Sequence, residues 1–196
     1  SGLLPLLSFF SELYPDIDVR IKAVDMDDGS LTDDVDVAIY YGRGKWKDLY
    51  AQKLHTEYLV PVCSPRLLNG IKPLKTPEDL KLHTLLHDTS RRDWTAWFKQ
   101  GNIIGVNVNQ GPIFSHTSMV LQAAIHGQGV ALGHSVLAQP EIDAGRLVRP
   151  FTDVLVSKNA YYVVCREEQD ELGKIVAFRD WMLSLVEEEQ QEFVEN

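Results

Sequence analysis

Three glycines in the stretch AIHGQGVALG, namely Gly127, Gly129 and Gly133, have nearly the spacing of a loop that cradles a dinucleotide phosphate. Such a loop follows a strand and opens a helix, because the phosphate binds at the helix N-terminus. Here the predicted order is reversed, with a helix over 117–126 before the glycines and a strand over 130–132 after them. We therefore interpret the stretch as a turn, with Gly127 in the left-handed conformation and Gly129 in a second unusual backbone conformation. No nucleotide or other cofactor is predicted.

Histidine spacing gives no metal site. His83 and His87 are four residues apart on a predicted strand, so they point to the same face about 13 Å apart and cannot share one ion. Three further histidines have no ligand partner nearby in the sequence; these are His55, His126 and His134.

Nucleophilic chemistry is equally poorly supported. The sequence contains no G-x-S-x-G motif and no placed cysteine–histidine pair. Ser118, His116 and Asp88 can be drawn as a triad, but a serine at a helix start is far more often a cap. Cys63 and Cys165 are either buried small hydrophobic residues or, less favoured, oxidant sensors near each other. We predict that the protein is not an enzyme.

Composition narrows the class further. The 196 residues are 44% hydrophobic and 24% charged, which is ordinary for a globular chain, and contain no apolar run long enough for a membrane span. A net charge of −9 disfavours direct binding of a nucleic-acid backbone. The segment SGLLPLLSFF lacks the basic start and cleavage site of a signal peptide. With only two cysteines, the chain is expected in the cytoplasm.

Hydrophobic periodicity predicts the elements that position these residues. Leu3, Leu7, Phe10 and Tyr14 mark a first helix, and strands are expected over 17–23, 35–41, 49–54 and 58–63. After a proline-punctuated passage, a short helix starts at Thr76-Pro77. The remaining expected strands are 83–87, VNVN, GPIFS, 130–132, LVRPF and AYYVVC; the remaining helices are one around Trp94 ending at Gly101, 117–126 with Met119 facing inward, 135–143 and 172–189. Alternating helices and strands indicate an α/β fold.

Five stretches in a fixed order carry a family resemblance. They are LLPLLSFFSELYPDIDVRI, DVDVAIYYGRGKW, LVPVCSPRLL, LLHDTSRRDWTAWF, and FSHTSMVLQAAIHGQGVALGHSVLAQPEIDAGRLVRPF followed by AYYVVC. Together they resemble the effector-binding domain of LysR-type transcriptional regulators, in the branch of the glycine-cleavage activator and the β-lactamase regulator. The resemblance implies two Rossmann-like lobes joined by two crossover strands, the architecture of type 2 periplasmic binding proteins. Lobe I would comprise 1–62 and 164–196, and lobe II 63–163.

The resemblance also implies a function. A small-molecule effector would bind in the cleft between the lobes, and the domain would form a homodimer, or a tetramer in the full-length regulator. DNA would be bound only through an N-terminal winged helix-turn-helix that this chain lacks, and no membrane is involved. The alternatives are a solute-binding protein of a transporter and, with less support, a small hydrolase or transferase on the same lobes.

Effectors of this family bind against helix N-termini, whose free N–H groups favour an anion. The resemblance places two such ends at Ser1 and at His116-Thr117-Ser118. Thr117 or Ser118 contacts the ligand, or the alternative is helix capping, which Ser115 or Thr117 would serve equally well. Asp88 either orients a ligand amine or, more favoured, caps the following helix. Tyr161 matches a groove tyrosine of the family, although a strand tyrosine is more often a core residue.

Overall fold

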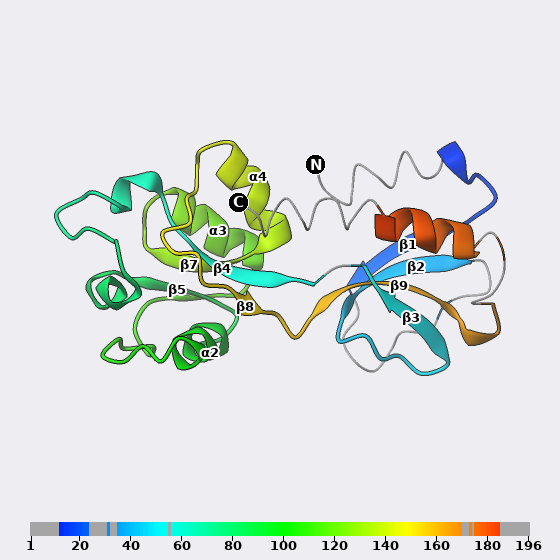
Figure 1. Ribbon diagram of the computed structural model, residues 1–196, viewed down its shortest axis with the longest axis horizontal. Helices are drawn as coiled ribbons and strands as arrows, with labels where there is room; N and C mark the ends of the chain where they lie inside the picture. Colours follow the sequence, from blue (N-terminus) through cyan, green and yellow to red (C-terminus); the bar gives the residue numbers. More distant parts are fainter. Residues whose placement is uncertain are drawn as a thin grey trace. The chain divides into compact units, whose positions relative to one another are not determined.

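The computed structural model describes residues 12–23, 31, 35–54, 56–169, 173 and 175–184, which form two compact units (Figure 1). Unit 1 comprises Ser1–Glu57 and Ser157–Asn196, and unit 2 comprises Tyr58–Val156. The predicted boundaries at 62/63 and 163/164 are therefore displaced. The reason is strand pairing: the strand Tyr58–Val62 belongs wholly to the sheet of unit 2, and the strand Ala160–Arg166 belongs wholly to that of unit 1.

The sheet of unit 1 is mixed. Strand β1 (Val19–Ala23) runs parallel to β2 (Val37–Gly42), and β9 (Ala160–Arg166) runs antiparallel to both β2 and β3 (Leu49–Lys53). One face of β2 packs with Ile175, Phe178 and Met182, three fully buried residues of a helix that covers 175–184. The other face packs with an aromatic cluster around Trp46. Burial on both faces explains why β2 reads as a nearly continuous apolar run.

The sheet of unit 2 has the strand order β6-β5-β7-β4-β8. Strands β5 (Leu85–Asp88), β6 (Ile113–Phe114) and β7 (Val130–His134) are parallel, whereas β4 (Tyr58–Val62) is antiparallel to β7 and β8 (Leu155–Val156). Helix α2 (Arg92–Gln100) lies on one side of this sheet, and α3 (Thr117–Ile125) and α4 (Ser135–Asp143) lie on the other (Figure 1). The carboxyl ends of β5, β6 and β7 therefore share one edge.

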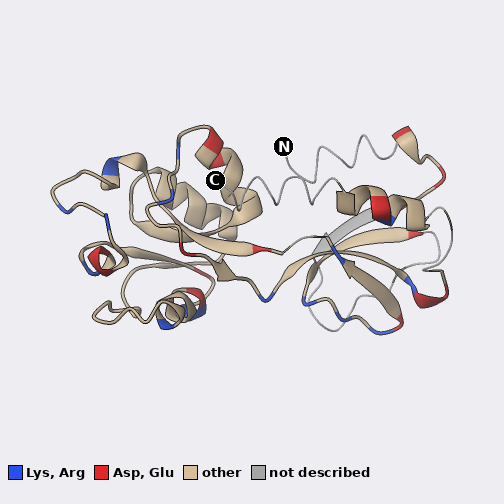
Figure 2. Cartoon of the chain, viewed as in Figure 1, with Lys and Arg blue, Asp and Glu red and all other residues tan. Residues whose placement is uncertain are grey.

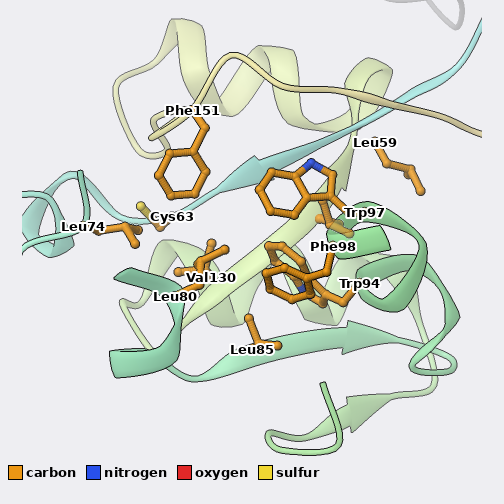
Figure 3. Packing of buried hydrophobic residues seen from close by; sticks show 11 residues of the cluster. Leu59, Cys63, Leu74, Leu80, Leu85, Trp94, Trp97, Phe98, Val130 and Phe151 are labelled. Carbon is orange, nitrogen blue, oxygen red and sulfur yellow. The ribbon is translucent and has the colours of Figure 1, made fainter. Parts of the chain in front are cut away.

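The core beneath α2 is aromatic. Trp94, Trp97 and Phe98 gather over the sheet in Figure 3, and the rings of Trp94 and Phe98 stack with centroids 5.4 Å apart. Trp97 packs against Phe151 with centroids 6.0 Å apart. Trp94 Nε1 donates a hydrogen bond to the Leu86 carbonyl oxygen at 3.1 Å, which satisfies the one polar atom of a fully buried ring. This cluster anchors α2 directly against β5.

Several local predictions are confirmed. Helix α4 has the predicted bounds 135–143, and Gly127 has a φ of 73° at the end of α3. The segment after Thr76 forms a short 3₁₀ helix over Pro77–Leu82, in which Asp79 Oδ2 accepts a hydrogen bond from Thr76 N at 2.9 Å. Gly129, in contrast, does not have the unusual φ predicted for it. Its role is close approach, because a Cβ there would lie 2.4 Å from the Thr84 carbonyl oxygen.

Other local predictions are wrong or fall outside the described residues. VNVN and LVRPF form no strands, apart from a single bridge between Val148 and Cys63, and in GPIFS only Ile113 and Phe114 are in a strand. Met119 does not face inward, since 47% of it is exposed. Most of the predicted first helix, including Leu3, Leu7 and Phe10, and the end of the last one lie outside the described residues.

Charged residues of both signs are interspersed over the two units (Figure 2). Of the described helices, none is both long enough and apolar enough to cross a bilayer.

Candidate functional site

The parallel strands of unit 2 bring polar side chains together at their carboxyl edge. Asp88 is the last residue of β5 and His134 is the last residue of β7, the neighbouring strand. Thr117 begins α3 shortly after β6, on the other side of β5. Residues 29 and more positions apart in sequence thus meet where open α/β sheets bind ligands.

One carboxylate connects these elements. Thr117 Oγ1 donates a hydrogen bond to Asp88 Oδ2 at 2.7 Å, and His134 Nε2 lies 3.4 Å from the same oxygen. The Asp88 side chain is only 10% exposed and that of His134 is 17% exposed. The second oxygen, Asp88 Oδ1, is buried and has no hydrogen-bond partner among the described residues. We refer to Asp88, Thr117 and His134 as the carboxylate cluster.

The carboxylate cluster favours the ionised form of its acid. Burial by itself would raise the pKa of Asp88, but the hydrogen bonds from His134 and Thr117 and the nearby charge of His134 outweigh it. The pKa of Asp88 therefore lies below its usual value, and the side chain is a carboxylate at neutral pH. A negative charge is thereby fixed next to the first turn of α3, where the helix dipole stabilises it.

The backbone around Asp88 is tightly constrained. Thr89, the next residue, has a φ of 60°, which is unusual for a β-branched side chain. Its N–H donates to the Phe114 carbonyl oxygen at 2.8 Å, and Ser90 N donates to the Asp88 carbonyl oxygen at 2.7 Å. These bonds turn the chain sharply at the end of β5 and hold the Asp88 side chain at the edge of the sheet.

A half-buried arginine at the start of α2 supports the loop before β6, next to the same edge. The Arg91 guanidinium donates to the carbonyl oxygens of Val108, Gln110 and Gly111 at 3.3, 3.0 and 3.1 Å. Gln110 O also lies 2.9 Å from His87 Nε2. Burial lowers the pKa of His87 most strongly, so that histidine is neutral and structural.

Tyr161 lies in unit 1, on β9. It pairs with Tyr41 of β2, and the two rings have centroids 4.9 Å apart. Burial, followed by the charge of Glu57, raises the pKa of the Tyr161 hydroxyl. The phenol is therefore neutral over the physiological range.

Comparison with known proteins decides the family. The sequence profile of the "LysR substrate binding domain" matches residues 1–187. The chain belongs to the LysR substrate-binding domain family. It is 64% identical to the "Glycine cleavage system transcriptional activator" of Escherichia coli strain K12, over 97% of this chain and 63% of that protein. It is 32% identical to the "HTH-type transcriptional activator AmpR" of Providencia stuartii, over 94% of this chain and 62% of that protein.

A solved structure gives the same result for the fold. The effector domain of the transcriptional regulator AmpR of Pseudomonas aeruginosa matches this LysR domain with a TM-score of 0.74 and 26% sequence identity, over 99% of this chain and 93% of that one. The predicted α/β fold, of the type 2 periplasmic-binding-protein class, is confirmed. The LysR domain spans about 63% of the length of the curated relatives it matches.

The site residues predicted for the LysR domain are only partly brought together. Asp88 and Thr117 are in direct contact, and His116 and Ser118, which flank Thr117, are exposed. Tyr161 lies in the other unit. Ser1 lies outside the described residues.

The structure supports neither the favoured capping role of Asp88 nor the capping alternative for Thr117. Thr117 is the first helical residue of α3 rather than its N-cap, and its hydroxyl donates to Asp88. Asp88 does not cap α2, because the N-cap position of that helix is Arg91, three residues further on. In both cases the side chain bonds to the other across the strand edge instead of to a helix end of its own. The hydrogen bond that each side chain was predicted to make with a helix end is thus made with a residue far away in the sequence.

His134 is the residue that the sequence analysis missed, since it has no partner nearby in the chain. The available signal was its place at the end of a predicted parallel strand, equivalent to that of Asp88 on the neighbouring strand. Because such ends meet at one edge, a strand-terminal histidine and a strand-terminal aspartate are expected to come close.

The two thiols lie in different units, Cys63 in unit 2 and Cys165 in unit 1, and both are buried. Burial raises the pKa of Cys63 to about 12, so this thiol is protonated and poorly reactive at neutral pH. A search of the described residues finds no cluster of three or more potential metal ligands.

Proposed function

We propose that this LysR domain is the effector-sensing part of a transcriptional activator that acts on glycine cleavage system genes. The observation that carries the proposal is the 64% identity to the Escherichia coli activator over 97% of the chain. A second relative, from Haemophilus influenzae, is named as a homolog of the same activator and is 43% identical over 97% of the chain.

In the proposed mechanism, a small molecule binds the domain and shifts its population between two states. The shift changes how the full-length protein, a homodimer or tetramer in the cytoplasm, binds DNA through an N-terminal winged helix-turn-helix. The coupling is a differential affinity of the effector for the two states. The domain itself has a binding role and no catalytic one. A transporter-associated role is not favoured, because the relatives named above are transcription regulators.

Gel-shift and reporter assays with the full-length protein test the proposal. The full-length protein is expected to retard a DNA fragment from upstream of the glycine cleavage genes, whereas residues 1–196 alone, with a net charge of −9, are not. Deleting the gene is expected to lower transcription from that promoter. Unchanged transcription together with no retardation of the fragment would refute the proposed role.

A further inference from the structure

We propose that the carboxylate cluster at the edge of the unit 2 sheet binds a protonated amine of the effector, with Asp88 Oδ1 as the acceptor. The inference rests on the proposed sensing function and names the chemical class of its ligand. Three observations carry it: an unused acceptor, a fixed negative charge, and an exposed rim.

The unused acceptor is the first observation. Asp88 Oδ2 is engaged with Thr117 at 2.7 Å and lies 3.4 Å from His134, whereas Oδ1 has no partner in the described part of the chain. A buried charged oxygen without a donor is unfavourable, and native proteins rarely keep one without a functional reason. The missing partner is a donor, and an ionised oxygen prefers a cationic donor.

The sign of the local charge is the second observation. A bare helix N-terminus attracts anions, but the first turn of α3 already has the Asp88 carboxylate bonded to its first residue. A ligand carboxylate or phosphate placed beside that oxygen would be repelled. An ammonium group is attracted by Asp88, and two of its three N–H donors have acceptors at the edge, namely Asp88 Oδ1 and the hydroxyl oxygen of Thr117.

The surroundings of the cluster are the third observation. Asp88 and His134 retain 10% and 17% exposure of their side chains, and His116 and Ser118 on either side of Thr117 are exposed. The cluster therefore lies at a surface edge of unit 2 and not in the centre of its core.

A panel of matched probes tests the proposal on residues 1–196. The twenty common amino acids are compared in thermal-shift and calorimetric assays with the hydroxy acids of the same carbon skeleton, such as L-alanine with L-lactate and L-phenylalanine with L-phenyllactate. At least one amine is expected to bind at millimolar or lower concentration, and about tenfold or more tightly than its hydroxy counterpart. Asp88→Asn is expected to weaken that binding by about tenfold or more, because the charged acceptor is lost.

A matched control variant keeps the test interpretable. Asp153→Asn removes a carboxylate from an exposed position of the same unit and is expected to change nothing. Equal binding of amine and hydroxy acid, undiminished binding by a folded Asp88→Asn variant, or no binding by any amine of the panel would overturn the inference.

The result is separable from the proposed function. A ligand without an amine that binds independently of Asp88 would overturn the inference and leave the sensing role intact. Conversely, loss of promoter binding by the full-length protein would overturn the proposed role even if amines bind the domain.

Discussion

The two sheets present their polar groups in different ways. In unit 2, Asp88 and His134 end neighbouring parallel strands, and their side chains meet the start of α3 at one edge. In unit 1, Tyr161 lies within an antiparallel strand, and its ring packs across the ladder on Tyr41. Parallel strands gather groups from distant parts of the chain into a cluster, whereas antiparallel pairing gives a pairwise aromatic contact. The unit 2 edge therefore groups polar side chains from three elements, whereas the printed contact of Tyr161 is an aromatic pair.

The largest loss of stability is expected from a substitution at Gly111, in the loop that packs against β5 of unit 2. A Cβ at Gly111 would lie 1.9 Å from the Leu85 carbonyl oxygen, at a φ of +91°. We expect Gly111→Ala to lower the free energy of unfolding by about 3 kcal/mol or more, since both the clash and the left-handed φ act. Chemical denaturation measures the change.

Gly105→Ala is the matched control for that substitution. Gly105 has a similar φ of +85°, but nothing lies within 4 Å of an added Cβ. Its loss should be only about 1–2 kcal/mol, the backbone contribution alone. Equal losses in the two variants would show that the backbone of Gly111 does not pack closely against β5.

The next effect concerns the cluster itself. Thr117→Val keeps the shape of the side chain but removes the donor to Asp88 Oδ2. We expect a loss of about 2 kcal/mol in the free energy of unfolding, because a charged, partly buried hydrogen bond is broken. This differs from the small stability change that a purely ligand-facing hydroxyl would give.

Thr95→Val provides the comparison. Its hydroxyl donates to the Arg91 carbonyl oxygen of its own helix at 2.8 Å on an exposed face, a bond that water replaces readily. If Thr117→Val loses no more free energy of unfolding than Thr95→Val, the carboxylate cluster contributes little to stability. The contrast between the polar cluster of unit 2 and the aromatic pair of unit 1 would then be small.

The helices and turns could be predicted from the sequence mainly where the local residue pattern determines their conformation. The bounds of α4 and the turn at Gly127 follow from periodicity and glycine chemistry. VNVN shows the limit of that reasoning: Val106 and Val108 do pack on the aromatic core, but alternation cannot reveal whether a neighbouring strand is available for pairing.

The candidate site was predictable only in part. Asp88 and Thr117 could be selected one by one, but their mutual bond is a long-range contact across 29 residues. His134 was missed for the same reason. From the local sequence, Asp88 and Thr117 could each be predicted to cap a helix end. In the folded chain, the parallel strands bring these two side chains together instead.

A smaller effect is expected on the pH dependence of stability, through the ionisation of Asp88 in unit 2. Because the folded pKa of Asp88 is below its usual value, the carboxylate stabilises the fold above its unfolded-state pKa, and this contribution is lost as the pH falls through the folded pKa. As the pH falls through the folded pKa of Asp88, the parent should lose stability more steeply than Asp88→Asn. Denaturation at a series of pH values tests this, and parallel curves would contradict it.

The smallest effect is expected at Tyr161. Tyr161→Phe keeps the ring contact with Tyr41 and should change the free energy of unfolding by about 1 kcal/mol or less at neutral pH. Burial and the charge of Glu57 raise the pKa of its hydroxyl, so the stability it contributes persists at neutral pH and is lost only as the pH rises through the folded pKa. In ultraviolet titration, the difference between the parent and Tyr161→Phe should appear above the ordinary range of tyrosine. A difference spectrum within that range would contradict the raised pKa of Tyr161. A stability loss as large as that of Thr117→Val would show that the Tyr161 hydroxyl stabilises unit 1 as much as the carboxylate cluster stabilises unit 2.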